Sequence, residues 1–116
     1  MKVALIGADG QLGTDLVAAL AGHEVVPLFW PKFDVTKPEE AAAVLLELRP
    51  DTVINTAAFH RVDECEDRAD MAFAVNAFAV RDLARTCREL GAALVFFSTD
   101  FVFDGRKASP YREEDR

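Results

Sequence analysis

One segment near the N-terminus constrains the fold of this chain more than any other: residues 7–13, which read GADGQLG. It follows an apolar run at residues 2–6 that predicts a buried strand. It leads into residues 11–20, whose apolar spacing predicts a helix. A glycine-rich turn between a strand and a helix is typical of the phosphate-binding end of dinucleotide-binding βαβ units. A turn that uses glycine only for its conformation is the alternative, and the strand–helix context favours nucleotide binding.

Each glycine has a separate physical use in such a turn. Gly7 permits the tight turn out of the strand, Gly10 lets the backbone approach a pyrophosphate, and Gly13 lets the helix pack against the sheet. The backbone amides of Gly10, Gln11 and Leu12 would then point at the phosphates from the positive end of the helix dipole.

The rest of the chain continues the same alternation of strands and helices. Further strands are expected at residues 24–28, 51–55 and 92–97, and further helices at residues 38–48 and 69–90. This order predicts an α/β fold, a Rossmann-type doubly wound parallel sheet truncated after about four strands. The last strand is apolar throughout, so we expect it to be covered on both faces. Thr36 and Glu39 have the spacing of a capping box that would open the second helix.

Composition and charge exclude several classes of protein. The chain is 51% hydrophobic, which suits a packed core, and its formal net charge of −7 disfavours nucleic-acid binding. No apolar run approaches the roughly 20 residues that span a bilayer, and the N-terminus does not resemble a secretion signal. We therefore expect a cytoplasmic protein without membrane or nucleic-acid partners. The cysteines and histidines lack metal-ligand spacing, so no metal site is predicted.

The adenosine end of the expected site departs from the usual pattern. Dinucleotide-binding folds usually carry an acid at the end of the second strand, but here that strand runs into residues 29–32, FWPK. Asp34 lies at about the expected distance along the chain, one loop further on. The missing acid and the nearby Lys32 favour NADP over NAD. A solvated surface lysine is the alternative, so both cofactors stay open.

Small and polar residues follow two of the later strands. Residues 53–59, VINTAAF, place small residues at a strand's carboxyl end, which would let a cofactor lie close to the backbone, or would only pack the next helix. Asn76 lies in the middle of a predicted helix, where asparagine is unfavourable, so its side chain is expected to hydrogen-bond a specific partner. Residues 98–100, STD, end the last strand, where ligands bind in open α/β sheets. A local Ser/Thr or Asx turn is the alternative.

Taken together, these motifs resemble those of the dTDP-4-dehydrorhamnose reductase family, within the extended short-chain dehydrogenase/reductase superfamily. The residues that carry the resemblance are GADGQLG, FDVT, NTAAFHRVDECED, the Val75-Asn76 pair, STDFVFDG and SPYREED. The resemblance covers nearly the whole chain, and GQLG together with the VFDG segment is its most specific part.

The resemblance implies a role for particular residues. It implies that Gly10, Gln11 and Leu12 hold the pyrophosphate, Asp34 and Val35 bracket the adenine, Ala57, Ala58 and Phe59 line the nicotinamide half, and Phe97 backs the nicotinamide ring. Thr99 would be the hydroxyl of the family's Thr/Ser–Tyr–Lys catalytic set, and Asp100 would touch the substrate. The implied reaction is hydride transfer from NADPH or NADH to the C4 ketone of dTDP-4-dehydro-L-rhamnose. Some members bind Mg²⁺ near the position of Asp15, but we predict no such site here.

Two departures from the family pattern qualify that reaction. Phe101 stands where the family usually has tyrosine, and the only tyrosine, Tyr111, is followed four residues later by Asp115 rather than by lysine. We therefore expect a dinucleotide-binding domain at residues 1–104 and, at 105–116, a polar tail that begins a further catalytic and substrate-binding portion. The 116-residue chain itself would lack turnover, and its bare sheet edge would favour a homo-oligomer.

Two alternative functions stay open. One is a non-catalytic dinucleotide-binding regulatory subunit that resembles the one of methionine adenosyltransferase. The other is an epimerase or dehydratase that acts on a different nucleotide sugar.

Overall fold

The sheet at the centre of the fold is parallel throughout. The computed structural model describes residues 1–115. The strands are β1 (Lys2–Ile6), β2 (Glu24–Leu28), β3 (Thr52–Asn55) and β4 (Ala93–Phe96). They lie in the order β2-β1-β3-β4, so the chain leaves β1 toward one side and later returns to its other side. This arrangement confirms the predicted Rossmann-type α/β fold.

Helices connect the strands, and the largest of them forms from three consecutive segments. The helices are α1 (Gln11–Ala19), α2 (Pro38–Leu48), α3 (Val62–Asp67), α4 (Ala69–Phe73), the π-helix η1 (Ala74–Phe78), α5 (Ala79–Leu90) and the 3₁₀-helix η2 (Asp100–Val102). The helix predicted over residues 69–90 is confirmed, with a π segment in its middle, and it ends at Gly91 in the left-handed conformation. We did not predict α3, because its acidic sequence has no apolar periodicity and it buries no residue.

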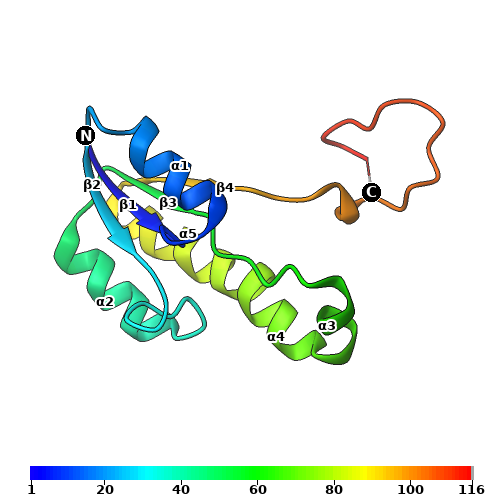
Figure 1. Ribbon diagram of the computed structural model, residues 1–116, viewed down its shortest axis with the longest axis horizontal. Coiled ribbons are helices and arrows are strands. Elements are labelled where there is room, and N and C mark those ends of the chain that lie inside the picture. The colour runs from blue at the N-terminus through cyan, green and yellow to red at the C-terminus, as the bar shows by residue number, and fades with distance from the viewer. Residues whose placement is uncertain (116) are drawn as a thin grey trace.

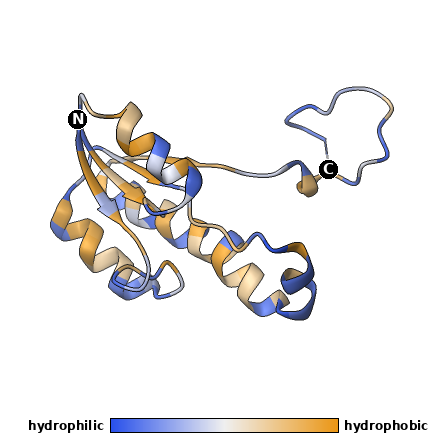
Figure 2. Cartoon of the chain, viewed as in Figure 1, coloured by the Kyte–Doolittle hydropathy of each residue, from blue (hydrophilic) through white to orange (hydrophobic). Residues whose placement is uncertain are grey.

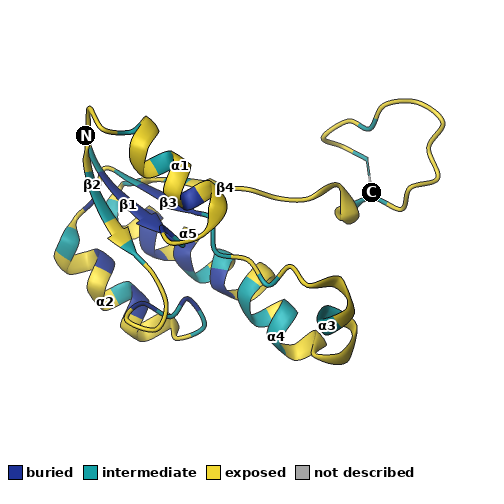
Figure 3. Ribbon diagram, in the orientation of Figure 1, coloured by how far each residue is buried: buried dark blue, intermediate teal, exposed yellow. Residues whose placement is uncertain are grey.

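The two faces of the sheet are covered by different helices, as a doubly wound fold requires (Figures 1 and 3). On one face, Ile6 and Val53 pack with Leu45 of α2 and Leu83 of α5 in the larger core cluster. On the other face, the buried strand residues Val3, Leu5 and Ile54 pack with Leu16 and Leu20. The strands and the helices that pack on them carry most of the hydrophobic colour in Figure 2.

The prediction for the last strand was wrong in one respect. β4 is covered on one face only: Leu94 packs with the larger cluster, whereas Ala93 and Val95 are exposed. The reason is that α1 packs over β1, β2 and β3, and no helix within residues 1–115 covers the same side of β4. Continuous apolar sequence therefore did not indicate burial on both faces here.

The predicted capping box at the start of α2 is also absent. Within residues 1–115, no side chain caps Lys37, which precedes Pro38 at the first helical position. The hydroxyl of Thr36 instead donates to Oδ1 of Asp34 (2.7 Å), which also accepts from the Thr36 amide (2.9 Å). Because Asp34 takes the Thr36 side chain, that side chain does not cap the helix.

Beyond β4 the chain leaves the sheet, passes through η2 and forms a polar loop that lies apart from helices α1 to α5 (Figures 1 and 2). The loop is closed by its own contacts: Tyr111 Oη donates to Oδ1 of Asp104 (2.8 Å), and the Tyr111 ring stacks on Phe103 at 4.3 Å between centroids. Lys107 pairs with Asp115. These contacts join residues on either side of position 104. The division into a domain at residues 1–104 and a tail at residues 105–116 stays a prediction.

Candidate functional site

A groove of about 820 Å³ opens at the carboxyl ends of β1, β2 and β3. It lies where β2 and β3 diverge from either side of β1, which is the place where open α/β sheets bind ligands. Of the predicted cofactor residues, those that line it are Gly7, Gly10, Gln11, Leu12, Gly13, Asp34, Val35, Ala57 and Ala58. The structure thus brings together residues from the glycine-rich turn, the loop after β2 and the loop after β3.

The glycine-rich turn cannot accept side chains at two of its positions. Gly7 has a φ of +77°, and a Cβ built there would lie 2.7 Å from Oγ1 of Thr56. A Cβ on Gly13 would collide with the carbonyl oxygen of Gly7 and with the backbone of Ala8. The turn is therefore glycine-dependent because strand, turn and helix backbones touch there.

Hydrogen bonds hold this turn to both neighbouring strands. The Gly7 amide donates to the carbonyl of Leu28 at the end of β2 (2.8 Å). On the other side, the hydroxyl of Thr56 lies 2.8 Å from the carbonyl oxygen of Ile6 and 3.1 Å from that of Gly7. The turn therefore keeps its place relative to the whole sheet.

The N-terminus of α1 presents open backbone amides to the groove. The first helical hydrogen bond runs from the Thr14 amide to the carbonyl of Gly10 (2.9 Å), and within residues 1–115 neither a side-chain cap nor a backbone acceptor occupies the amides of Gln11 and Leu12. No acid lies in the first turn. Such a helix end suits a phosphate group, which completes its hydrogen bonds and meets its positive dipole.

Gly10 differs from its sequence-based prediction. Its amide closes the turn by donating to the carbonyl of Gly7 (3.0 Å), so it is engaged within the protein. Gly10 still leaves space for a ligand, because only the Gly7 oxygen, at 3.3 Å, lies within 4 Å of a Cβ built on Gly10. The missing side chain leaves room beside the amides of Gln11 and Leu12.

Aromatic residues that the sequence analysis did not assign to the site line the groove after β2. They are Phe29, Trp30 and Phe33, and the Phe33 amide donates to the carbonyl of Phe29 (3.0 Å). Lys32 is not among the lining residues, and within residues 1–115 the groove has no lysine or arginine in its lining. The only sequence signal for this wall was aromatic residues in place of the usual acid.

The loop after β3 is held by Asn76 from η1. The Asn76 side chain accepts from the Phe59 amide (2.9 Å) and donates to the Phe59 carbonyl (2.8 Å). The predicted specific partner of Asn76 is thus confirmed. Phe59 itself does not line the groove, but this pair of bonds anchors the loop that carries Ala57 and Ala58.

The residues after β4 lie outside the groove lining. Phe97, Thr99 and Asp100 are all exposed. Thr99 Oγ1 accepts from the Phe101 amide and lies near Oδ1 of Asp100, each at 3.3 Å, which is the local Ser/Thr turn that the sequence left open. The catalytic and substrate roles of Thr99 and Asp100, and the cofactor role of Phe97, stay predictions.

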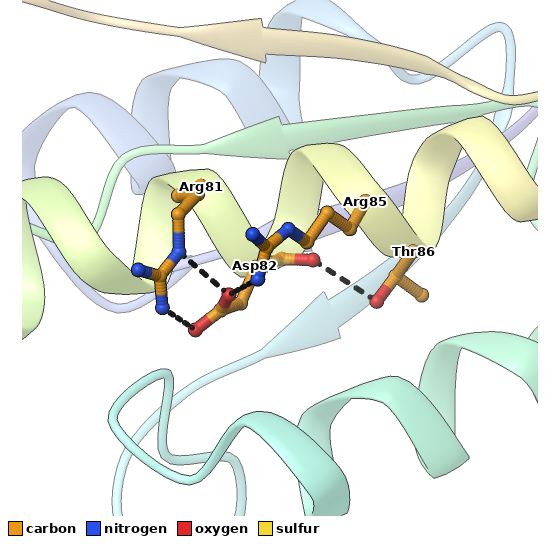
Figure 4. Close-up of polar contacts among 4 residues, drawn as sticks. All are labelled: Arg81, Asp82, Arg85 and Thr86. Atoms are coloured by element: carbon orange, nitrogen blue, oxygen red, sulfur yellow. Dashed lines mark hydrogen bonds and ion pairs between the residues drawn. The ribbon is translucent and has the colours of Figure 1, made fainter.

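An ion-pair cluster lies on the side of α5 that faces α2 (Figure 4). The carboxylate of Asp82 accepts from Arg81 (3.0 and 3.1 Å) and from Arg85 (3.2 Å), and its backbone carbonyl accepts from the hydroxyl of Thr86 (3.1 Å). The hydrogen bond from Arg81, followed by its charge and that of Arg85, lowers the pKa of Asp82. This cluster lies away from the groove, so it belongs to the scaffold.

Metal and membrane features are both missing from the part of the chain that the structure describes. In residues 1–115, no three acidic, histidine or cysteine side chains gather as they would around a metal ion. No helix there combines the length and apolar character that crossing a bilayer takes. Asp15, near which some family members bind Mg²⁺, is exposed on α1.

Known proteins resemble this chain in both sequence and fold. The family model described as RmlD substrate binding domain matches residues 1–116. The chain belongs to the dTDP-4-dehydrorhamnose reductase family. The resemblance drawn from the motifs is therefore confirmed.

Two reductases with solved structures and one curated sequence illustrate the match. A dTDP-4-dehydrorhamnose reductase from Burkholderia thailandensis is 42% identical over 116 residues, which make up 99% of this chain and 39% of the relative. The solved reductase from Clostridium acetobutylicum superposes on the whole chain and on 42% of its own, with a TM-score of 0.95 and 38% identity. A Bacillus anthracis reductase solved in complex with NADP matches 91% of this chain and 39% of its own (TM-score 0.86, 35% identity).

These reductases are much longer than the matched region. The chain spans 39% of the Burkholderia relative and 42% of the Clostridium one. In this chain, the matched region forms the Rossmann-type sheet with its glycine-rich turn.

Proposed function

We propose that this chain binds NADP(H) or NAD(H) in the groove and forms the dinucleotide-binding part of a dTDP-4-dehydrorhamnose reductase. The whole protein would reduce dTDP-4-dehydro-L-rhamnose to dTDP-L-rhamnose in nucleotide-sugar biosynthesis. The observation that carries the proposal is the N-terminus of α1, where the amides of Gln11 and Leu12 are open beside a turn that excludes side chains.

The groove residues divide along the length of a dinucleotide. The amides of Gln11 and Leu12 would hold the pyrophosphate, in the space that Gly10 leaves open. Asp34 and Val35 would lie at the adenine end. Opposite them, Ala57 and Ala58 would lie beneath the nicotinamide half, because small side chains let a ring approach the backbone. The nicotinamide supplies the hydride when the cofactor is bound.

Thr99 and Asp100 would serve the substrate, and Phe97 would back the nicotinamide ring, as the family pattern implies. The hydroxyl of Thr99 would donate to the C4 oxygen that becomes an alkoxide, and Asp100 would contact the sugar. Reduction also needs an acid to protonate that oxygen. Tyr111 does not fit this role, because its hydroxyl is bonded to Asp104 and the residue four positions later is Asp115. We therefore propose that the 116-residue chain binds cofactor without turnover.

One experiment tests binding and turnover separately. NADPH affinity is measured by isothermal titration calorimetry, and NADPH consumption is followed at its nicotinamide absorbance with dTDP-4-dehydro-L-rhamnose present. We expect measurable binding and no steady consumption. Replacing Gly10 with alanine should weaken binding roughly tenfold, about 1.4 kcal/mol, because the methyl group enters the phosphate space.

The matched control is Gly22→Ala, since a Cβ there meets nothing within 4 Å. Absence of NADPH and NADH binding by the chain would contradict the proposed cofactor site. Steady reductase activity would instead contradict the proposed lack of turnover.

Self-association is a second part of the proposal. β4 ends the sheet, and the side chains of Ala93 and Val95 are exposed on its uncovered face. An exposed apolar strand at a sheet edge tends to pair with another chain. We propose a homo-oligomer, which light scattering over a concentration series would detect, and a Val95→Lys variant should shift it toward monomer.

A further inference from the structure

Trp30 is the most exposed large aromatic residue in the groove lining. It is 71% exposed, compared with 37% for Phe29 and 5% for Phe33. It is also the only tryptophan in the chain. Because the indole is exposed and also borders a concave site, its flat face is available for a ligand ring to stack on.

The backbone around Trp30 is constrained on both sides. The Phe33 amide closes the turn on the carbonyl of Phe29 (3.0 Å), and the Asp34 side chain is occupied by Thr36. The carbonyl of Leu28, immediately before this segment, accepts from the Gly7 amide of the glycine-rich turn. The indole is therefore carried by a segment that is tied to the phosphate end of the groove.

The charges around this part of the groove suit an uncharged ring. Asp9 and Asp34 are the acidic side chains in the lining, and within residues 1–115 it contains no lysine or arginine. A phosphate would therefore find no lysine or arginine here, whereas a purine ring needs only a flat apolar face on which to stack. The position is the end of the second strand, where dinucleotide folds hold adenosine and where this chain lacks the usual ribose-binding acid.

We propose that the Trp30 indole stacks on the adenine ring of the bound dinucleotide and forms the outer wall of the adenine subsite. The inference rests on the proposed function, because it names how one end of the same cofactor is recognised. Stacking replaces the ribose–carboxylate contact as the main adenosine interaction in this chain. Because stacking does not depend on the 2′ position, Trp30 should contribute equally to the binding of NADPH and NADH.

The single tryptophan allows a direct test in the full chain. Trp30 emission is followed while ADP, NADPH or nicotinamide mononucleotide is added in separate titrations. We expect ADP and NADPH to change the emission saturably, and nicotinamide mononucleotide to leave it unchanged. Calorimetry should then show that Trp30→Ala weakens ADP and NADPH binding about tenfold each, while Trp30→Phe stays within about threefold of the unchanged chain.

Phe73→Ala is the matched control, because Phe73 is 60% exposed and lies outside the groove lining. If ADP and NADPH bind but neither Trp30 emission nor the Trp30→Ala affinity changes, the inference is wrong and the proposed cofactor site stands. An equal emission change with nicotinamide mononucleotide would place Trp30 at the other end of the cofactor and would also overturn it. If neither ADP nor NADPH binds, the inference fails together with the proposed function.

Discussion

The two ends of the predicted site are held in different ways. At the phosphate end, the glycine-rich turn is bonded to β2 through Leu28 and to β3 through Thr56. At the substrate end, Thr99 and Asp100 follow β4 in an exposed turn whose hydrogen bonds reach only neighbouring residues. The first region takes its geometry from the sheet, whereas the second takes it from local chain conformation.

The difference predicts that cofactor affinity and reactivity depend on separate regions of the proposed site. A phosphate-binding turn needs fixed amides, because each misplaced donor loses a charge-assisted hydrogen bond. Thr99 and Asp100, which we propose contact the substrate, follow a strand with one uncovered face, and neither of them lies in the groove lining. We infer that cofactor binding and substrate handling respond to substitutions independently.

The largest loss of unfolding free energy should come from a side chain at Gly13, where the α1 backbone touches the glycine-rich turn. Gly13→Val places side-chain atoms against the Gly7 carbonyl and the Ala8 backbone, so we expect about 3 kcal/mol of lost unfolding free energy. Urea denaturation followed by circular dichroism measures it. Gly22→Ala should lose little unfolding free energy, because a Cβ at Gly22 meets nothing within 4 Å. Equal stability of the Gly13 and Gly22 variants would show that the turn is not held by backbone contact.

An intermediate effect is expected at the loop after β3. Asn76→Ala removes both hydrogen bonds to Phe59, and at about 1 kcal/mol each the unfolding free energy should fall by about 2 kcal/mol. NADPH affinity should fall as well, because Ala57 and Ala58 lose their anchored loop.

Thr99→Val is the matched variant at the other end of the site. It removes only the two local contacts of the Thr99 hydroxyl, with the Phe101 amide and with Oδ1 of Asp100, so stability should change by about 0.5 kcal/mol and NADPH affinity should stay the same. A drop in NADPH affinity for Thr99→Val as large as that for Asn76→Ala would break the distinction between the two ends.

The smallest effect concerns the ion-pair cluster on the side of α5 that faces α2, away from the groove. Arg81 and Arg85 lower the pKa of Asp82 in the folded chain below its value of about 3.9 in the unfolded chain. The ionised carboxylate therefore stabilises the fold at pH values above about 3.9, and this contribution is lost as the pH falls through the lower folded pKa. Thermal unfolding measured from pH 7 to pH 3 should show this loss, and Asp82→Asn should reduce it. An identical pH profile for Asp82→Asn would mean that these ion pairs add nothing to stability.

Local features were predictable from the sequence where one backbone requirement decides them. The glycine-rich turn, the four strands and the stop at Gly91 all follow from apolar runs and from positions that favour glycine. The bonding of Asn76 was predictable for a similar reason, since an asparagine within a helix is costly unless its side chain has a partner. Its partner, Phe59, was not predictable, because nothing local links the two positions.

The predictions for the capping box, for the burial of the last strand and for the groove lining failed for two reasons. Neighbouring side chains compete for hydrogen bonds, and the placement of helices is not encoded locally. Thr36 had the spacing of a helix cap, but Asp34 was close enough to take its hydroxyl. The apolar residues of β4 gave no sign that one face would stay open, because that depends on which strands α1 covers. The sequence showed aromatic residues after the second strand, but it did not show that they line the groove, because packing decides which residues line a groove.

The sequence by itself determined the order of the four strands and of the longer helices between them, the glycine-dependent turn and the family, because each rests on short motifs of neighbouring residues. Only the tertiary structure decided that hydrogen bonds join the turn to both flanking segments, at the end of β2 and directly after β3. It also decided that the Gly10 amide donates to the Gly7 carbonyl, and that Trp30 lines the groove. The physical reason is that hydrogen bonds and exposure at the ends of parallel strands depend on segments up to fifty residues apart, such as Thr56 with Ile6. Apolar periodicity reports which side chains are buried, and it does not report which backbone they meet.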